Sequence, residues 1–157
     1  MAEQQQASED AVLTRIGQAV MLLHAGDRAE ARNRLAGIWT ELGPDGDPLH
    51  RCTLAHYMAD AQDDPVDELA WDLRALTAAD AVPGAPAAAP APAVRAFYPS
   101  LHLNLAADYL KLRRPQAART HLDRARAATS ALGEDGYGDG VRAAIHRMEL
   151  RMPRDVG

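Results

Sequence analysis

His56 and Asp60, spaced four residues apart, are the first residues in this chain that could do chemistry. On a helix this spacing places an imidazole and a carboxylate on one face, and both groups are ligands for transition metals. His102 could join them from a later helix. The sequence adds no HExxH, CxxC, phosphate-binding loop or serine elbow. Metal binding or small-molecule processing in the His56/Asp60/His102 region therefore stays an alternative, while we predict no enzyme activity, no cofactor and no metal.

Acidic side chains are concentrated around this pair. Six lie between His56 and Asp72, and no Lys or Arg interrupts them. Four of the six surround the expected start of a helix at Pro65, where carboxylates interact favourably with the helix dipole. These four are Asp63, Asp64, Asp67 and Glu68. We interpret them mainly as helix-start residues, and His56 with Asp60 as the centre of a polar surface.

The charge balance and the cysteine count exclude several classes of protein. The chain has 157 residues and a formal net charge of −5, which disfavours a nucleic-acid binder that relies on phosphate contacts. Cys52 is the only cysteine, so no intramolecular disulfide can form, and the first ten residues lack the pattern of a secretory signal. Charges interrupt every apolar run that could cross a bilayer. We predict a cytoplasmic protein with no nucleic-acid or membrane partner.

Apolar residues recur at helical spacing along most of the chain and predict an all-α fold of about seven helices. Six of the expected helices form three hairpins, which turn near Gly26–Asp27, at "DDP" before Val66 and at "RRP" before Gln116. A seventh helix is expected over about 140–152, where it would cover the open end of the stack.

The segment 82–94 is rich in Pro and Ala and can neither continue a helix nor build a core. We interpret it as a surface loop inserted between the second and third hairpins. The predicted organisation is a disordered N-terminus over 1–8, a single helical domain over 9–152 and a tail over 153–157.

Helical hairpins of roughly 34 residues, each unable to bury its apolar face alone, are typical of stacked repeats. In the third hairpin, large, small and aromatic residues follow the order of one such family: Leu105, Ala106, Tyr109, Ala118, Leu122 and Ala125. The first hairpin agrees through Ala19, Leu22, Gly26, Asp27, Ala31, Leu35 and Ile38. The chain thus resembles the tetratricopeptide repeat (TPR) family, with about three degenerate repeats and a C-terminal capping helix. The resemblance implies a short right-handed solenoid of antiparallel helix hairpins with a concave, peptide-binding groove.

Two of the expected helices each carry one narrow polar stripe on an otherwise apolar surface. The stripe of the third helix consists of Thr53, His56, Asp60 and Asp63, and that of the fifth consists of Ser100, Asn104, Asp108 and Lys111. In the TPR family the first helix of each hairpin lines the groove, so the resemblance implies one partner-binding surface made of both stripes. The alternative is that each stripe is only the solvated side of a mostly buried helix.

The resemblance implies a non-catalytic adaptor or scaffold that binds a protein or peptide. The acidic residues favour a basic segment as partner, through charge complementarity. Asn104 stands where the family's clamps for C-terminal carboxylates have an asparagine, but their basic residues are largely missing here. The segment from Lys111 to Arg126 holds six Lys or Arg and one acidic residue, so two copies could also pair as a homodimer.

Overall fold

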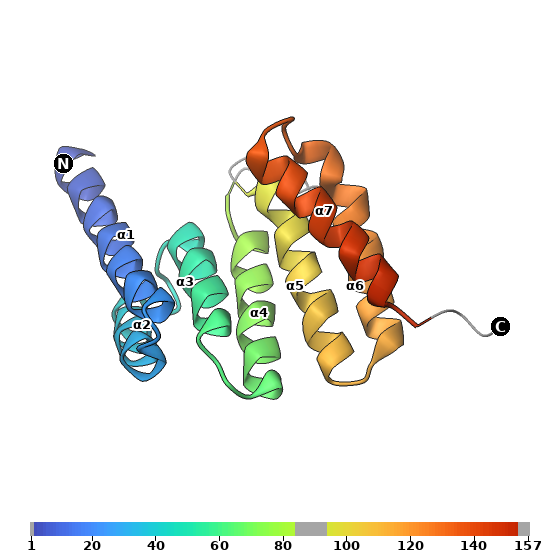
Figure 1. Cartoon of the computed structure of the whole chain (residues 1–157). Coiled ribbons are helices and arrows are strands. Elements are labelled where there is room, and N and C mark those ends of the chain that lie inside the picture. Colours follow the sequence, from blue (N-terminus) through green and yellow to red (C-terminus); the bar gives the residue numbers. More distant parts are fainter. Residues whose placement is uncertain (1, 84–93, 154–157) are drawn as a thin grey trace. The chain divides into compact units, whose positions relative to one another are not determined.

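The computed structural model describes residues 2–83 and 94–153, with side chains from residue 11 onward in those ranges. This part of the chain contains seven α-helices, two short 3₁₀ helices and no strand, so the predicted all-α fold is confirmed (Figure 1). The α-helices are α1 (Ala2–His24), α2 (Arg28–Leu42), α3 (Pro48–Asp60), α4 (Pro65–Asp80), α5 (Tyr98–Lys111), α6 (Pro115–Ala127) and α7 (Gly136–Arg151). The 3₁₀ helices are η1 (Arg95–Phe97) and η2 (Ala128–Ala131).

The helix starts follow from capping residues that the sequence supplies. The side chain of Asp27 accepts a hydrogen bond from the backbone N–H of Glu30, and Asp47 does the same for Leu49. Proline occupies the first position of α3, α4 and α6, where its missing N–H removes no helical hydrogen bond. Gly26 closes α1 with a φ of 91°, a conformation that favours glycine.

The predicted boundaries differ from the observed ones mainly at the chain ends and around the loop. α1 starts at Ala2, so residues 2–8, expected to be disordered, belong to a helix. α7 starts at Gly136 rather than near Gly140, because the carboxylate of Asp135 accepts a hydrogen bond from the N–H of Gly138. Residues 84–93 of the expected loop and 154–157 of the expected tail lie outside the described residues.

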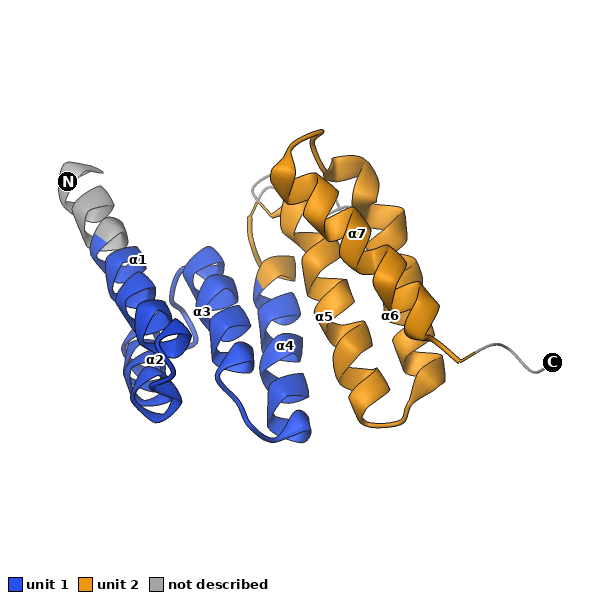
Figure 2. Ribbon diagram, viewed as in Figure 1, with its two compact units in different colours: residues 1–78 blue, residues 79–157 orange. Residues whose placement is uncertain are grey.

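The contacts divide the chain into two compact units, where the sequence predicted one domain over 9–152. Unit 1 is Met1–Ala78 and unit 2 is Ala79–Gly157, so the division falls inside α4 (Figure 2). Each unit is described by itself below.

Unit 1 is built around the hairpin of α1 and α2, against which α3 packs. Its main core contains six fully or nearly fully buried residues: Ile16, Ala19, Leu35, Ile38, Leu54 and Met58. Trp39 and Trp71 pack against this core and meet edge to face, with ring centroids 5.2 Å apart. The two tryptophans are therefore packing residues of unit 1.

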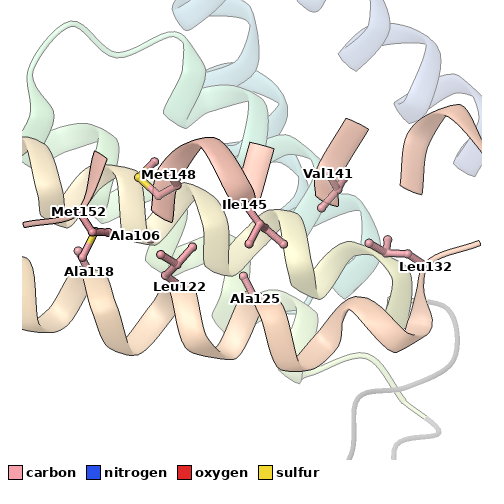
Figure 3. Packing of buried hydrophobic residues seen from close by; sticks show 9 residues of the cluster. All are labelled: Ala106, Ala118, Leu122, Ala125, Leu132, Val141, Ile145, Met148 and Met152. Carbon is pink, nitrogen blue, oxygen red and sulfur yellow. The ribbon is translucent and has the colours of Figure 1, made fainter. Parts of the chain in front are cut away.

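Unit 2 is built around the hairpin of α5 and α6, and α7 packs against both helices. Figure 3 shows how Val141, Ile145 and Met148 of α7 face Leu122 and Ala125 of α6. The small residues Ala106, Ala118 and Ala125 are completely buried, which allows the backbones of α5 and α6 to approach closely. α7 thus covers an apolar face of the α5–α6 hairpin within unit 2, while its predicted role of covering the open end of a stack of three hairpins stays a prediction.

Candidate functional site

Thr53, His56 and Asp60 of the predicted α3 stripe lie in unit 1 and differ in their surroundings. The hydroxyl of Thr53 donates to the carbonyl of Leu49, 2.9 Å away, so it bonds within its own helix. His56 is partly buried and contacts the ring of Tyr57 edge-on, with centroids 5.1 Å apart. Asp60 is exposed at the last position of α3. His56 and Asp60 are therefore the two members of this group that contribute ionisable groups to the surface.

Charged side chains of α1, α2, α3 and α4 influence the pKa of Asp60. Its pKa is raised because neighbouring atoms displace water from the carboxylate, while the charge of His56 opposes this shift. Glu68 of α4 raises the pKa further, and His24 of α1 and Arg28 of α2 lower it. The end of α3 thus carries a carboxylate that lacks full compensation for its charge and would gain from a nearby cation.

Asp63 has a different role from the one that the stripe assigned to it. Its two carboxylate oxygens accept from Arg28, at 2.9 Å, and from Arg32, at 3.2 Å. These ion pairs lower the pKa of Asp63 and join the turn after α3 to α2. The same two arginines donate to backbone carbonyls of Asp60, Ala61 and Gln62. Asp63 is a structural brace, and the i, i+4 pair Arg28 and Arg32 is the sequence feature that could have indicated it.

The helix-start interpretation of the acidic cluster holds best for Asp64. Its carboxylate accepts a hydrogen bond from the N–H of Val66 at 2.8 Å, which satisfies a backbone donor that α4 leaves unpaired. Asp67 and Glu68 occupy the first turn of α4, where their charge complements the helix dipole. The six acidic residues are therefore one brace, one cap, two first-turn carboxylates, the exposed Asp60 and the buried Asp72.

The predicted α5 stripe, in unit 2, is interrupted by burial. Ser100 is already engaged, since its hydroxyl lies 2.9 Å from the hydroxyl of Tyr137 on α7. Asn104 is partly buried and Lys111 is exposed. Only 2% of Asp108 is accessible, so this residue does not belong to an exposed stripe. Because the two stripes belong to different units, the single surface that they were expected to form stays a prediction.

A pair of histidines in unit 2 was not predicted. The Nδ1 atoms of His102 on α5 and His121 on α6 lie 3.0 Å apart, and the two rings stack at 22°. Tyr98 packs against His102 at a tilt and Tyr109 stacks on His121, while the hydroxyl of Tyr98 donates to Asp80. The hairpin pattern could have suggested this contact, because it places the middle of α5 against the middle of α6.

The pKa of His102 is lowered to about 4, first by burial and then by the neighbouring His121 and Arg124, against the opposing charge of Asp80. The pKa of His121 is also lowered, by burial and then by Arg124. At neutral pH both rings are uncharged, and one Nδ1–H donates to the other Nδ1. His102 thus belongs to a contact between helices within unit 2.

Within residues 2–83 and 94–153, no group of three or more His, Cys, Asp or Glu side chains is arranged to hold a metal ion. Cys52 is buried, with 4% of its surface accessible. None of the helices in the described ranges combines the length and the apolar content needed to cross a bilayer.

No protein-family model, curated protein or solved structure matches the chain.

Proposed function

We propose that this chain is a non-catalytic interaction module of the TPR type, which binds a peptide or protein segment as an adaptor or scaffold. The buried signature positions of the first and third hairpins support this assignment. Six of these positions are completely buried: Ala19, Ala31 and Leu35 in unit 1, and Leu105, Ala118 and Leu122 in unit 2. A repeat that uses these positions for packing leaves its remaining helix faces available for a partner.

The observation that carries the proposal is the environment of Asp60. Asp63, three residues away, is compensated by two arginines, whereas the raised pKa of Asp60 shows that its ionised form is disfavoured. A lysine or arginine from a partner would stabilise the Asp60 carboxylate, because a cation placed next to a partly desolvated anion interacts strongly. The geometry thus favours a segment with at least one basic side chain.

The net negative charge of unit 1 also favours a basic partner, and it acts over a longer distance than a single ion pair. Residues 1–78 contain 14 Asp and Glu and only six Lys and Arg. An excess of negative charge of this size attracts basic segments and raises their association rate at low salt. The partner is therefore a basic peptide or protein segment, and the proposed setting is the cytoplasm, with no nucleic-acid or membrane partner.

A randomised peptide library, selected on the immobilised full chain, tests the proposal. We expect wild type to enrich sequences with Lys or Arg, and the double variant His56→Ala, Asp60→Asn to bind the enriched peptides about tenfold more weakly, the effect of roughly 1.4 kcal/mol. Asp67→Asn is the matched control, because it removes one exposed carboxylate of unit 1 without touching Asp60. The proposal fails if wild type enriches nothing, or if the double variant and the control bind equally well.

A further inference from the structure

A small pocket in unit 2 lies outside the surface considered so far. It has a volume of about 210 Å³ and is formed by the end of α6, the short helix η2 and one face of α7. Its lining residues are Arg126, Thr129, Arg142, Ile145, His146 and Glu149. Ile145 is 5% exposed and belongs to the core of unit 2, so the pocket has an apolar side and a strongly polar rim.

The charges of this pocket are unevenly distributed. Glu149 is its one carboxylate, and two guanidinium groups bind it, Arg119 at 3.1 Å and Arg126 more closely. Arg142 adds another positive charge to the lining. Asp123 and Asp139 approach Arg126 and Arg142 only to 3.9 and 3.6 Å from exposed positions, where ion pairs are weak. Among the residues that line the pocket, two arginines thus stand against one carboxylate.

The arginines are held in place, yet they retain hydrogen-bonding capacity. Arg142 donates through Nη1 to the carbonyl of Gly133 and through Nη2 to that of Leu132, which fixes its guanidinium group. A guanidinium group has five N–H donors, so these two bonds leave others for a ligand. Thr129 donates its hydroxyl to the carbonyl of Arg126 at 2.7 Å, and its oxygen can still accept. His146, one turn after Arg142, adds an exposed imidazole.

We propose that this pocket binds a small oxyanion, a phosphate or a carboxylate group, through Arg126, Arg142 and His146. Arginine recognises both groups through paired N–H donors, and Arg119 and Arg126 already bind a carboxylate, that of Glu149. The volume fits a small group rather than a large organic ligand. Unit 2 as a whole favours an anion, since residues 79–157 contain 11 Lys and Arg against eight Asp and Glu.

Isoleucine methyl NMR provides a direct test with internal controls. The chain has three isoleucines: Ile145 lines the pocket, while Ile16 and Ile38 are buried in the core of unit 1. We expect inorganic phosphate or acetate, added at constant ionic strength, to move the Ile145 signal in a saturable way and to leave Ile16 and Ile38 unchanged. The expected Kd is roughly 1 to 10 mM, because the pairs are partly exposed to water. Phosphate and acetate, compared separately, identify the preferred source of the anion.

Three variants decide whether the pocket itself binds the anion. His146→Ala should weaken binding several-fold, whereas Arg147→Gln, an exposed arginine outside the lining, should not. Glu149→Gln should tighten binding, because it releases Arg119 and Arg126 from their carboxylate, and a merely destabilised protein would not bind more tightly. A linear, non-saturating shift of Ile145, equal effects of the His146 and Arg147 variants, or weaker binding by a folded Glu149→Gln variant would each overturn the proposal.

Discussion

The Nδ1 atoms of His102 and His121 lie 3.0 Å apart at the contact between α5 and α6. Between two neutral imidazoles this geometry requires the Nδ1–H of one ring to donate a hydrogen bond to the unprotonated Nδ1 of the other. Protonation of the accepting nitrogen breaks this hydrogen bond and places a positive charge in a partly desolvated space. The helix contact at the centre of unit 2 therefore depends on both histidines staying neutral.

The stability of unit 2 should decrease as the pH falls from about 6.5 to 4. The pKa of His102 in the folded chain is lowered to about 4 from 6.5, so the unfolded chain binds more protons in this range, and acid favours unfolding. We expect the free energy of unfolding to fall by about 1 to 2 kcal/mol between pH 7 and 4.5, since water near the pair reduces the cost of charging it. Urea unfolding followed by circular dichroism at several pH values measures this.

The double variant His102→Phe, His121→Phe is the control for this prediction. It keeps aromatic rings in the stack and removes both titrating groups, so its stability should vary less with pH than that of wild type in the same range. An unchanged pH dependence would show that other groups cause the loss of stability.

Asp63→Asn should lower the melting temperature of unit 1 by a few degrees. The change weakens the ion pairs of Asp63 with Arg28 and Arg32, which join the turn after α3 to α2. The pKa of Asp63 is lowered in the folded chain, so this stabilisation is present above the ordinary pKa of an aspartate and is lost as the pH falls. The only two tryptophans, Trp39 and Trp71, lie in unit 1, and their fluorescence reports its unfolding. Equal melting of wild type and variant would contradict the role of Asp63 as a brace.

Leu122→Ala should destabilise unit 2 by roughly 2 to 5 kcal/mol, because it removes a large apolar side chain from a packed core. Leu122 of α6 is completely buried and belongs to the core that α6 forms with α7. Leu150→Ala on α7 is the control, since 74% of Leu150 is exposed and its truncation leaves no cavity. Far-ultraviolet circular dichroism during urea unfolding measures both changes. Similar losses in the two variants would contradict the packing described for unit 2.

The helices of this chain could be predicted because their signals are local. Apolar spacing identifies the buried face, and residues such as Asp27 and Pro115 mark helix starts through the backbone groups that they satisfy or lack. The start of α7 differs from the predicted one by four residues, since the cap formed by Asp135 precedes a glycine-rich first turn, and glycine is a weak helix signal.

The roles of the polar residues were harder to predict, because they depend on partners that are distant in the sequence. Asp63 is paired by arginines 31 and 35 residues away, and Ser100 lies against a tyrosine 37 residues away. Helical spacing placed Asp108 on a polar face, but its burial depends on what packs around the helix. A polar stripe in a repeat sequence thus combines braces, caps and surface groups, and only the contacts in the folded chain show which residue has which role.

Asp60→Asn should leave the melting temperature of unit 1 unchanged or raise it slightly at pH 7, in contrast to Asp63→Asn. The pKa of Asp60 is raised in the folded chain, so ionisation is less favourable there than in the unfolded chain. Any stabilisation from the Asp60 carboxyl group is therefore present below the ordinary pKa of an aspartate and is lost as the pH rises through the pKa of Asp60 in the folded chain. Asparagine does not ionise, so the variant does not lose stability in this way. Tryptophan fluorescence on heating compares the two variants directly. A clear fall in melting temperature for Asp60→Asn would show that Asp60 stabilises the fold, and a surface role for its carboxylate would lose its main support.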